Sequence, residues 1–428
     1  MQTFDIRSST PIRRLPVLRT EVMATNSKDA HTRHLPSDFW TGFDSWQGDP
    51  DHWVGERVSR FLGDLDTHAL QQICTATRKG IACTISDRFA CGTENVLKEI
   101  VYEDGVVWVA RLAIKRQPPE VIRSEVTTMR YIKEHTTIPI PQVMGYDDSA
   151  DNSASCQYIL MEGIYGRPYT EPGAHHLFHL PDNKVGAVFA QLADILVQLS
   201  SLRFPEIGSL NIDENGQLYI GDVYGTSLRG RFKKCSTPLQ YFQSIITNSV
   251  NRAESMDDNR KAAILSTAKL KTQLASRFLS HADTYPLTHP DFQAQNVLFD
   301  DEFRIVGVID WSYAHTVPVE CMCCVPGGGY ILPEFQINAI SPAWKDRVMY
   351  LQSVRLRFRN ALCQELRAAE DEKLLISRGN QDTIMEEPPL SHIFETASAR
   401  HATIFAEFYY PQDREIIDLL EDKLLICY

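Results

Sequence analysis

Apolar residues recur at helical intervals in two segments of the first third of the chain. Residues 51–79 carry apolar side chains three or four positions apart, which predicts a helical segment, and Gly63 predicts a break within it. Residues 119–134 show the same period, and Pro139 and Pro141 follow as stop signals. We therefore expect a helical N-terminal extension and one later helix.

The residues between these segments change to a strand-like pattern. Residues 96–102 and 106–112 are rich in β-branched and aromatic side chains, and they flank the turn pair Asp104-Gly105. Two such runs around Asp-Gly predict a β-hairpin. A further apolar run at 158–161 predicts another strand. Residues 81–162 should accordingly form a small antiparallel sheet that carries one helix.

Helical periodicity dominates the rest of the chain. Residues 297–299 and 305–309 form two short apolar runs around the acidic turn Asp300-Asp301, which predicts a small hairpin inside a mainly helical region. The expected helices cover residues 182–203, 254–282 and 342–377, and two more follow Leu390. No internal repeat is visible.

Composition excludes several classes of protein. The chain has 428 residues, of which 43% are hydrophobic and 23% charged, and this is ordinary globular composition rather than that of a disordered, collagenous or coiled-coil protein. The net charge of −12, without a run of Lys or Arg, disfavours nucleic-acid binding. No apolar stretch approaches the roughly 18 residues of a membrane span. We expect a soluble, cytoplasmic protein with no nucleic-acid or membrane partner.

The N-terminal residues and the cysteines also bear on the expected location of the protein in the cell. Residues 1–36 combine Ser, Thr and Pro with several arginines, which is typical of an unstructured tail. Mitochondrial targeting is the less favoured alternative, because Asp5, Pro11 and Pro16 interrupt the amphipathic helix that it requires. The ten cysteines are scattered, which favours reduced thiols over a disulfide framework.

Two polar loops carry the strongest chemical signal. Asp291 and Asn296 lie five positions apart in one loop, and Asp310 ends the next apolar run. Phosphoryl transfer from ATP needs a carboxylate that takes the acceptor's proton and oxygen ligands that hold Mg²⁺ against the phosphates. Asp291 would be the base, with Asn296 and Asp310 as the Mg²⁺ ligands. Taken singly, each of these residues is as readily a turn former.

The sequence His289-x-Asp291-x-x-x-x-Asn296, followed by Asp310, resembles the catalytic and metal loops of the aminoglycoside phosphotransferase family. The resemblance covers about residues 85–325 and is closest to the fungal branch. It implies an α+β, two-lobed protein-kinase-like fold, with a small antiparallel β-rich N-lobe, a larger helical C-lobe and ATP between them. His289 would support the loop rather than act in catalysis.

The resemblance also implies roles for residues outside the two loops. Arg111 stands at the basic position that contacts the α- and β-phosphates, and Glu125 stands where the helix glutamate pairs with it. Gly92 and Asn95 stand in the loop that covers the phosphates. A further pair, Glu162 and Ile164, stands in the interlobe hinge, whose backbone groups hydrogen-bond adenine in relatives.

The sequence departs from the family pattern at several positions that bear on catalytic efficiency and on the identity of the acceptor. Arg111 replaces the usual Lys, for which Lys98 or Lys115 are alternative sources of charge, and the phosphate loop has a single glycine. The segment after Asp310 contains Cys321, Cys323 and Cys324, which are expected to be inert thiols because a zinc site needs four ligands. No activation segment ending in Ala-Pro-Glu is present, which argues against a protein substrate.

The sequence analysis thus predicts an ATP- and Mg²⁺-dependent enzyme that phosphorylates a hydroxyl of a small molecule, such as an aminoglycoside, an amino alcohol or a secondary metabolite. The alternative is a catalytically weak or inactive kinase-fold module that binds a nucleotide or a partner. The acceptor and the oligomeric state stay open. The expected regions are a tail (1–36), a helical extension (37–80), an N-lobe (81–162) and a helical C-lobe (163–428).

Overall fold

The computed structural model describes twelve segments of the chain, all within the unit His34–Tyr428. They are residues 34–36, 40–42, 53–92, 94–168, 182–225, 230–254, 261–262, 265, 268, 282–292, 294–322 and 362–370. Residues 1–33, the two helices expected after Leu390, and most of the helices expected at 254–282 and 342–377 lie outside the described residues. Where the last of these is described, at 362–370, it is helical.

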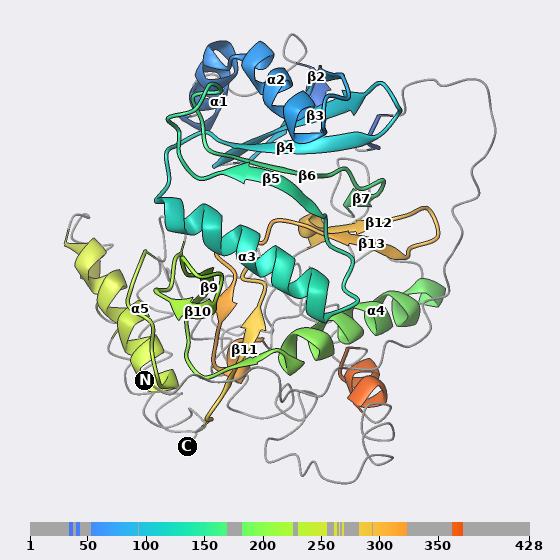
Figure 1. Cartoon of the computed structure of the whole chain (residues 1–428). Helices are drawn as coiled ribbons and strands as arrows, with labels where there is room; N and C mark the ends of the chain where they lie inside the picture. The colour runs from blue at the N-terminus through green and yellow to red at the C-terminus, as the bar shows by residue number, and fades with distance from the viewer. Residues whose placement is uncertain are drawn as a thin grey trace, which may run out of the picture. The chain divides into compact units, whose positions relative to one another are not determined.

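A six-stranded antiparallel sheet forms the N-terminal part of this unit (Figure 1). The strand order is β1-β2-β3-β4-β6-β5, and every neighbouring pair is antiparallel. The strands are β1 (Thr41–Gly42), β2 (Cys83–Cys91), β3 (Asn95–Tyr102), β4 (Val107–Ala113), β5 (Val143–Asp147) and β6 (Tyr158–Glu162). Gly105 supplies the positive φ of +81° that the predicted β3–β4 turn requires.

Helices cover both faces of this sheet (Figure 1). Helices α1 (Trp53–Asp64) and α2 (Thr67–Thr77) lie on one face, and α3 (Pro119–His135) lies on the other. Asp66 caps α2 by accepting a hydrogen bond from the Ala69 N–H at 2.9 Å, and Pro119 occupies the first turn of α3. Because both faces are covered, all seven residues of β4 are buried.

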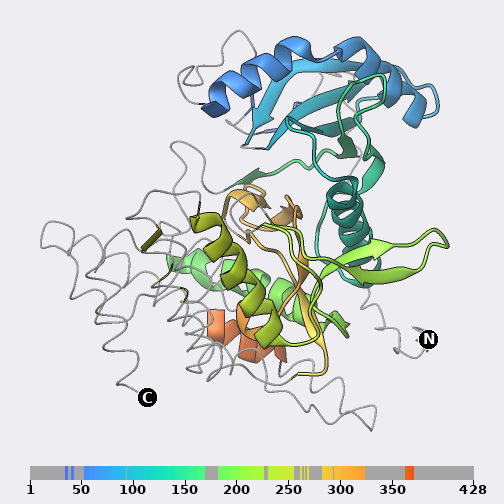
Figure 2. The same cartoon turned by 90° about the vertical axis from the view of Figure 1, so that its left-hand side faces the viewer.

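The C-terminal part consists of helices around three small sheets (Figure 2). Helices α4 (Asp182–Ser201) and α5 (Pro238–Ala253) accompany the sheets β10-β9, β14-β11-β8 and β13-β12-β7. The strands are β7 (Arg167–Pro168), β8 (Arg203–Phe204), β9 (Ser209–Ile212), β10 (Leu218–Gly221), β11 (Tyr285–Thr288), β12 (Val297–Phe299), β13 (Ile305–Val308) and β14 (His315–Thr316), with 3₁₀ turns at Ala294–Asn296 and Val319–Met322. In both views, β12 and β13 lie between the six-stranded sheet and α4.

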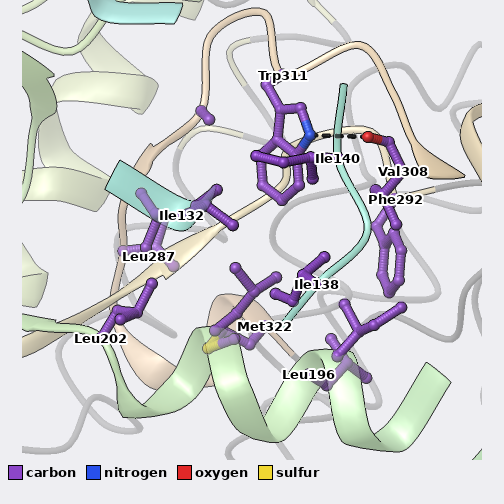
Figure 3. Packing of buried hydrophobic residues seen from close by; sticks show 14 of the residues in the cluster. Ile132, Ile138, Ile140, Leu196, Leu202, Leu287, Phe292, Val308, Trp311 and Met322 are labelled. Atoms are coloured by element: carbon purple, nitrogen blue, oxygen red, sulfur yellow. Dashed lines mark hydrogen bonds between the residues drawn. The ribbon is translucent and has the colours of Figure 1, made fainter. Parts of the chain in front are cut away.

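One buried cluster joins the two parts (Figure 3). Ile132 of α3 and Leu196 of α4 belong to the same cluster as Trp311, which follows β13. The Trp311 indole is fully buried, and its N–H donates to the Val308 carbonyl at 3.0 Å. The hydrophobic core therefore fixes the loops that carry the predicted catalytic residues.

The predicted helices at 51–79, 119–134 and 182–203 and the two predicted hairpins are confirmed, as is the small antiparallel sheet. The break in the first helix falls at residues 65–66 rather than at Gly63. The β9–β10 hairpin and helix α5 were not predicted. Strands of four residues, such as β9 and β10, are too short to show a clear alternation. Among the described residues, no helix combines the length and apolarity needed to cross a bilayer.

Candidate active site

A pocket of about 930 Å³ brings most of the predicted site residues together. Strands β2–β4, the segment after β6 and the two polar loops all contribute to its lining. The predicted residues that line it are Gly92, Asn95, Arg111, Glu162, Ile164, Asp291, Asn296 and Asp310. Glu125 is not part of the lining; it is buried behind Arg111. Residues separated by more than 200 positions in the sequence therefore face one cavity.

Hydrogen bonds fix the loop that carries Asp291. The Asn296 side-chain amide donates both to the Asp291 carbonyl and to its Oδ2, each at 2.9 Å. The Gln295 amide donates to the same Oδ2 at 3.3 Å. The Asp291 side chain keeps its exposure to the pocket, while Asn296 is buried. The carboxylate is thus held in one orientation by its own loop.

His289 joins this loop to the second one. The Asp291 N–H donates to His289 Nδ1 at 3.2 Å, so the ring proton lies on Nε2, which donates to the Ile309 carbonyl at 2.9 Å. Burial lowers the pKa of His289, which keeps the ring neutral in this arrangement. His289 does not line the pocket, in agreement with a supporting rather than a catalytic position.

Asp310 lies two residues after β13 and has an unusual backbone conformation. Its φ is +62°, a region that residues other than glycine seldom adopt and that is found preferentially at functional sites. The preceding Ile309 N–H donates to the Asn296 carbonyl at 2.9 Å, which links the two loops a second time. The Ser312 hydroxyl donates to Asp310 Oδ1 at 2.6 Å. The Asp310 carboxylate is therefore oriented on the same side as Asn296, toward the pocket that both line.

Arg111, which lines the pocket, forms a buried ion pair with Glu125 behind it. Arg111 lies in the middle of β4, and its Nη1 is 3.0 Å from Oε2 of Glu125 on α3. Its Nη2 donates to the Ser312 hydroxyl at 2.5 Å, and with the Asn95 amide oxygen turned toward it, also to Asn95 at 3.0 Å. One chain of polar contacts therefore connects the ion pair, through Ser312, to Asp310.

The Glu125 carboxyl titrates in an unusual range. Burial raises its pKa from 4.5 to about 7, and the Asp310 carboxylate adds to this, while Arg111 and Ser312 act in the opposite direction. The folded protein binds the Glu125 proton more tightly than the unfolded chain does. Protonated Glu125 therefore contributes stability that is fully present below pH 4.5 and is lost as the pH rises through 7.

The raised pKa of Glu125 predicts how the stability of Glu125→Gln, whose side chain cannot ionise, compares with that of the wild type at different pH values. The free energy of unfolding of the wild type, minus that of the variant, should decrease between pH 5 and pH 8. The measurement is urea denaturation of both proteins across that range. A difference that rises with pH would contradict the raised pKa. Glu134→Gln, an exposed change on the same helix, is the control and should show no such trend.

Two residues beside the ion pair were not identified from the sequence. The Tyr313 hydroxyl donates to the Glu94 carboxylate at 2.5 Å, and burial together with this bond raises the pKa of Tyr313, which keeps the hydroxyl protonated. Both residues line the pocket, as does Ser312. The residues that follow Asp310 offer a sequence signal for Ser312 and Tyr313 alone.

The two lysines considered as alternatives to Arg111, Lys98 and Lys115, do not line the pocket. Lys98 is buried in β3 and donates to the Asp87 carbonyl at 3.2 Å. Arg111 is the one Lys or Arg among the described lining residues. Any phosphate charge in this part of the pocket would therefore face Arg111.

The segment after β6 packs closely against the β12–β13 hairpin. A Cβ added to Gly166 would lie 2.5 Å from Cγ2 of Val306, and one added to Gly307 would lie 2.8 Å from Cδ1 of Ile164. Glycine at both positions permits this close approach. The Ile164 N–H has no partner among the described residues, and Ile164 lines the pocket.

Residues 34–36 and 40–42, here called the N-terminal strap, contribute one wall of the pocket through Leu35 and Trp40. Leu35 is buried, lines the pocket and lies against the position of Gly163, where an added Cβ would be 3.3 Å from Cδ2 of Leu35. Trp40 also lines the pocket, and β1 extends the sheet beyond β2. Residues 34–36 were expected in an unstructured tail, so this wall was not predicted from the sequence.

Glu99 fastens the N-terminal strap to the sheet. Its carboxylate is fully buried on β3 and accepts hydrogen bonds from the Leu35 N–H at 2.7 Å and from His34 Nδ1 at 2.6 Å. Arg88 lies 3.5 Å from the same carboxylate and donates to the Leu35 carbonyl at 3.2 Å. A buried carboxylate requires such partners, because an isolated one is strongly disfavoured.

Glu99→Leu should therefore release the N-terminal strap. We expect faster hydrogen exchange at Leu35 and a lower melting temperature, because both the charge partner of Arg88 and the acceptor of the Leu35 N–H are lost. Hydrogen-exchange mass spectrometry measures the first effect. The control is Glu103→Leu, an exposed change in the β3–β4 turn, which should leave exchange at Leu35 unchanged. Equal exchange in Glu99→Leu and wild type would show that Glu99 does not hold the strap.

An antiparallel sheet followed by helices, with two polar loops facing one pocket, defines an α+β fold of the kinase-like class, as expected from the sequence. The phosphotransferase enzyme family, APH, matches residues 88–321, which is more than half of the chain. The chain therefore belongs to this family, and the resemblance in its sequence motifs is confirmed.

Individual relatives align over smaller parts. A subtelomeric hrmA-associated cluster protein of Aspergillus fumigatus is 31% identical over 87 residues, which is 20% of this chain and 16% of the relative. A probable acyl-CoA dehydrogenase of Arabidopsis thaliana is 24% identical over 212 residues, 47% of this chain and 23% of the relative. The aligned parts thus span less than a quarter of the length of these curated relatives.

Solved structures align over more of the chain at low identity. Aminoglycoside phosphotransferase APH(4)-Ia is 16% identical, covers 82% of this chain and 98% of its own, and gives a TM-score of 0.44. Macrolide 2′-phosphotransferase type I is 16% identical, covers 84% of this chain and 96% of its own, and gives a TM-score of 0.43.

Proposed function

We propose that this protein transfers the γ-phosphoryl group of ATP to a hydroxyl of a small molecule. The observation that carries the proposal is the joint arrangement of Asp291, Asn296 and Asp310, on two hydrogen-bonded loops that face Arg111 across one pocket. A volume of about 930 Å³ lies within the range of ligand pockets and leaves room for a nucleotide and an acceptor.

Asp291 acts as the base in this proposal. The acceptor oxygen forms a bond to the γ-phosphorus, and the bond from that phosphorus to the oxygen bridging the β- and γ-phosphates breaks, so that ADP leaves with the electron pair. The hydroxyl proton passes to the Asp291 carboxylate and then to solvent. The hydrogen bonds from Asn296 and Gln295 hold the carboxylate in place for this transfer.

Arg111 faces the developing phosphate charge. Glu125 and Ser312 orient its guanidinium, and Gly92 in the β2–β3 turn and Asn95 at the start of β3 line the same pocket. A guanidinium held in this way need not reorganise as charge shifts to the leaving group, which favours electrostatic stabilisation of the transition state. Arg111 therefore takes the role that a lysine has in the usual family pattern.

The residues proposed for Mg²⁺ fit that ion. The Asn296 amide nitrogen is directed to Asp291, which leaves its carbonyl oxygen as the available ligand atom, and Asp310 supplies a carboxylate. Amide and carboxylate oxygens are the hard ligands that Mg²⁺ prefers. When bound, the ion would neutralise charge on the phosphates.

Adenine is proposed to lie against the segment after β6. Ile164 lines the pocket, and its N–H lacks a partner among the described residues. This N–H is proposed as the donor to a ring nitrogen, and the Glu162 carbonyl is proposed as the acceptor for the exocyclic amine. The apolar side chains of Leu35, Val109 and Leu298 line the same pocket and would contact the base.

Nucleotide binding and transfer are tested separately. ATP with Mg²⁺ should raise the melting temperature, because a ligand that binds only the folded state stabilises it. ADP release should then depend on an added acceptor. Absence of both effects would contradict the proposal, and stabilisation without release from any acceptor would leave binding without transfer.

One observation favours a second candidate, a catalytically weak or inactive nucleotide-binding module. Arg111 replaces lysine, and its guanidinium is already engaged by Glu125 and Ser312. Retention of the hydrogen-bonded pair Asp291 and Asn296 favours the enzyme instead, since a module that only binds has no need of an oriented base.

A further inference from the structure

One side of the pocket is an aromatic and aliphatic surface, here called the acceptor wall. It consists of Val223, Tyr224, Phe232, Tyr241 and Ile245, all of which line the pocket. Val223 and Phe232 are paired by two backbone hydrogen bonds of 2.9 and 3.1 Å, and Tyr241 and Ile245 lie one turn apart on α5.

The acceptor wall adjoins the loop of Asp291. His315 on β14 is paired with Thr288 on β11, and the polar loop begins at the next residue, His289. The Tyr241 hydroxyl is 2.9 Å from Nε2 of His315. A molecule held against the wall would therefore place one end beside the Asp291 carboxylate.

Three of the five wall residues, Val223, Phe232 and Ile245, have hydrocarbon side chains, and the Tyr241 hydroxyl is paired with His315. His315 Nδ1 lies 2.8 Å from the Tyr313 carbonyl, so this nitrogen carries the ring proton, and Nε2 accepts from the Tyr241 hydroxyl. The Phe232 ring packs edge-on against Tyr241 at a centroid distance of 5.7 Å. Aromatic surfaces of this kind favour another ring or a flat apolar body.

The carboxylates among the described lining residues lie outside the acceptor wall. Four carboxylates occur among the described lining residues, and two of them, Asp291 and Asp310, belong to the proposed reaction. Glu94 accepts from the Tyr313 hydroxyl at 2.5 Å, and Glu162 accepts from the Gln142 N–H at 3.1 Å. An ammonium group buried against the acceptor wall would therefore have no direct ion-pair partner among the described residues of the wall, which makes its desolvation costly.

Resting on the proposed function, we infer that the acceptor is an uncharged alcohol or phenol whose apolar ring lies against Phe232 and Tyr241, with its hydroxyl at Asp291. Polycationic sugars are poor acceptors. The overall acidic charge of the chain does not alter this, because the recognition surface is local.

The test compares two sets of acceptors. Naringenin, estradiol and menthol represent uncharged ring alcohols, and kanamycin and hygromycin B represent polycationic sugars. ADP release is measured with the full chain. Binding is measured independently of transfer, as the rise in melting temperature that each acceptor causes in Asp291→Ala with ADP and Mg²⁺. We expect release and stabilisation with members of the first set alone.

Phe232→Ala tests the wall itself. It should raise the KM for a ring alcohol by about 10-fold or more, because burial of an aromatic ring is lost, and should change kcat much less. Its stabilisation by ATP and Mg²⁺ reports whether it is folded. Tyr219→Ala, which removes an exposed aromatic side chain outside the pocket, is the matched control and should leave KM unchanged.

The outcomes separate this inference from the proposed function. Release with cations alone would overturn the inference and keep the phosphotransferase activity. Stabilisation by ring alcohols without any release would keep the inference and overturn the activity. Neither binding nor release with any acceptor would count against both, and an unchanged KM in Phe232→Ala would remove the acceptor wall from recognition.

Discussion

Replacement of Asp291 by alanine is expected to lower the rate of acceptor-dependent ADP release by about 10²–10⁴-fold, the usual contribution of a general base. The side chain is exposed to the pocket, so its removal leaves no buried cavity. The partners that it loses are side-chain amides of its own loop, and one of these, Asn296, keeps its bond to the Asp291 carbonyl. Folding and nucleotide binding should therefore survive, and the loss should fall on kcat.

The measurement is steady-state ADP release together with the melting temperature, with and without ATP and Mg²⁺. Asp301→Ala is the matched control, because Asp301 is an exposed carboxylate in the β12–β13 turn that does not line the pocket. Wild-type turnover in Asp291→Ala would refute its role as the base. A large loss of turnover in the control would show that the change is not specific to the pocket.

The second large effect is a difference in lost stability, depending on which partner of the buried Arg111–Glu125 ion pair is removed. Glu125→Leu should destabilise the protein by about 3–5 kcal/mol, because it leaves the Arg111 guanidinium buried without a carboxylate. Arg111→Met should cost less. Glu125 can take up a proton when its partner is lost, and its pKa is already about 7, whereas a guanidinium stays charged.

Urea denaturation of the two variants at pH 7 checks this order. The double variant Arg111→Met/Glu125→Leu should be more stable than Glu125→Leu alone, because no charge then remains buried. Both variants that lack Arg111 should lose stabilisation by ATP and Mg²⁺. A greater cost for Arg111→Met than for Glu125→Leu would contradict the proposed origin of the asymmetry.

Local patterns in the sequence were sufficient to predict the elements that carry the site. The hairpin at Asp104-Gly105 and the five-residue spacing of Asp291 and Asn296 depend on neighbours in the sequence, and the structure places them as expected. Five further residues expected in the site also line the same pocket, together with Asp310. Their chemical roles are proposals that the predicted variants test.

Contacts between distant segments could not be predicted in this way. Glu94 and Tyr313 are 219 positions apart, and Leu35 and Glu99 are 64 apart. No short-range period connects such pairs. One signal was present, since Glu99 lies in a run of strand-forming residues where a buried charge needs a partner, but nothing in the sequence indicated that the partner would be the backbone of Leu35.

The N-terminal strap has a consequence for how the smallest working form of this protein is delimited. The family match begins at residue 88, yet Leu35 and Trp40 supply part of the pocket, and α2 covers one face of the sheet through Leu70 and Cys74. A polypeptide trimmed to residue 88 would expose the Glu99 carboxylate and uncover an apolar face. The first residue of the family match is therefore not the first residue of the folding unit. Recombinant versions should begin no later than His34.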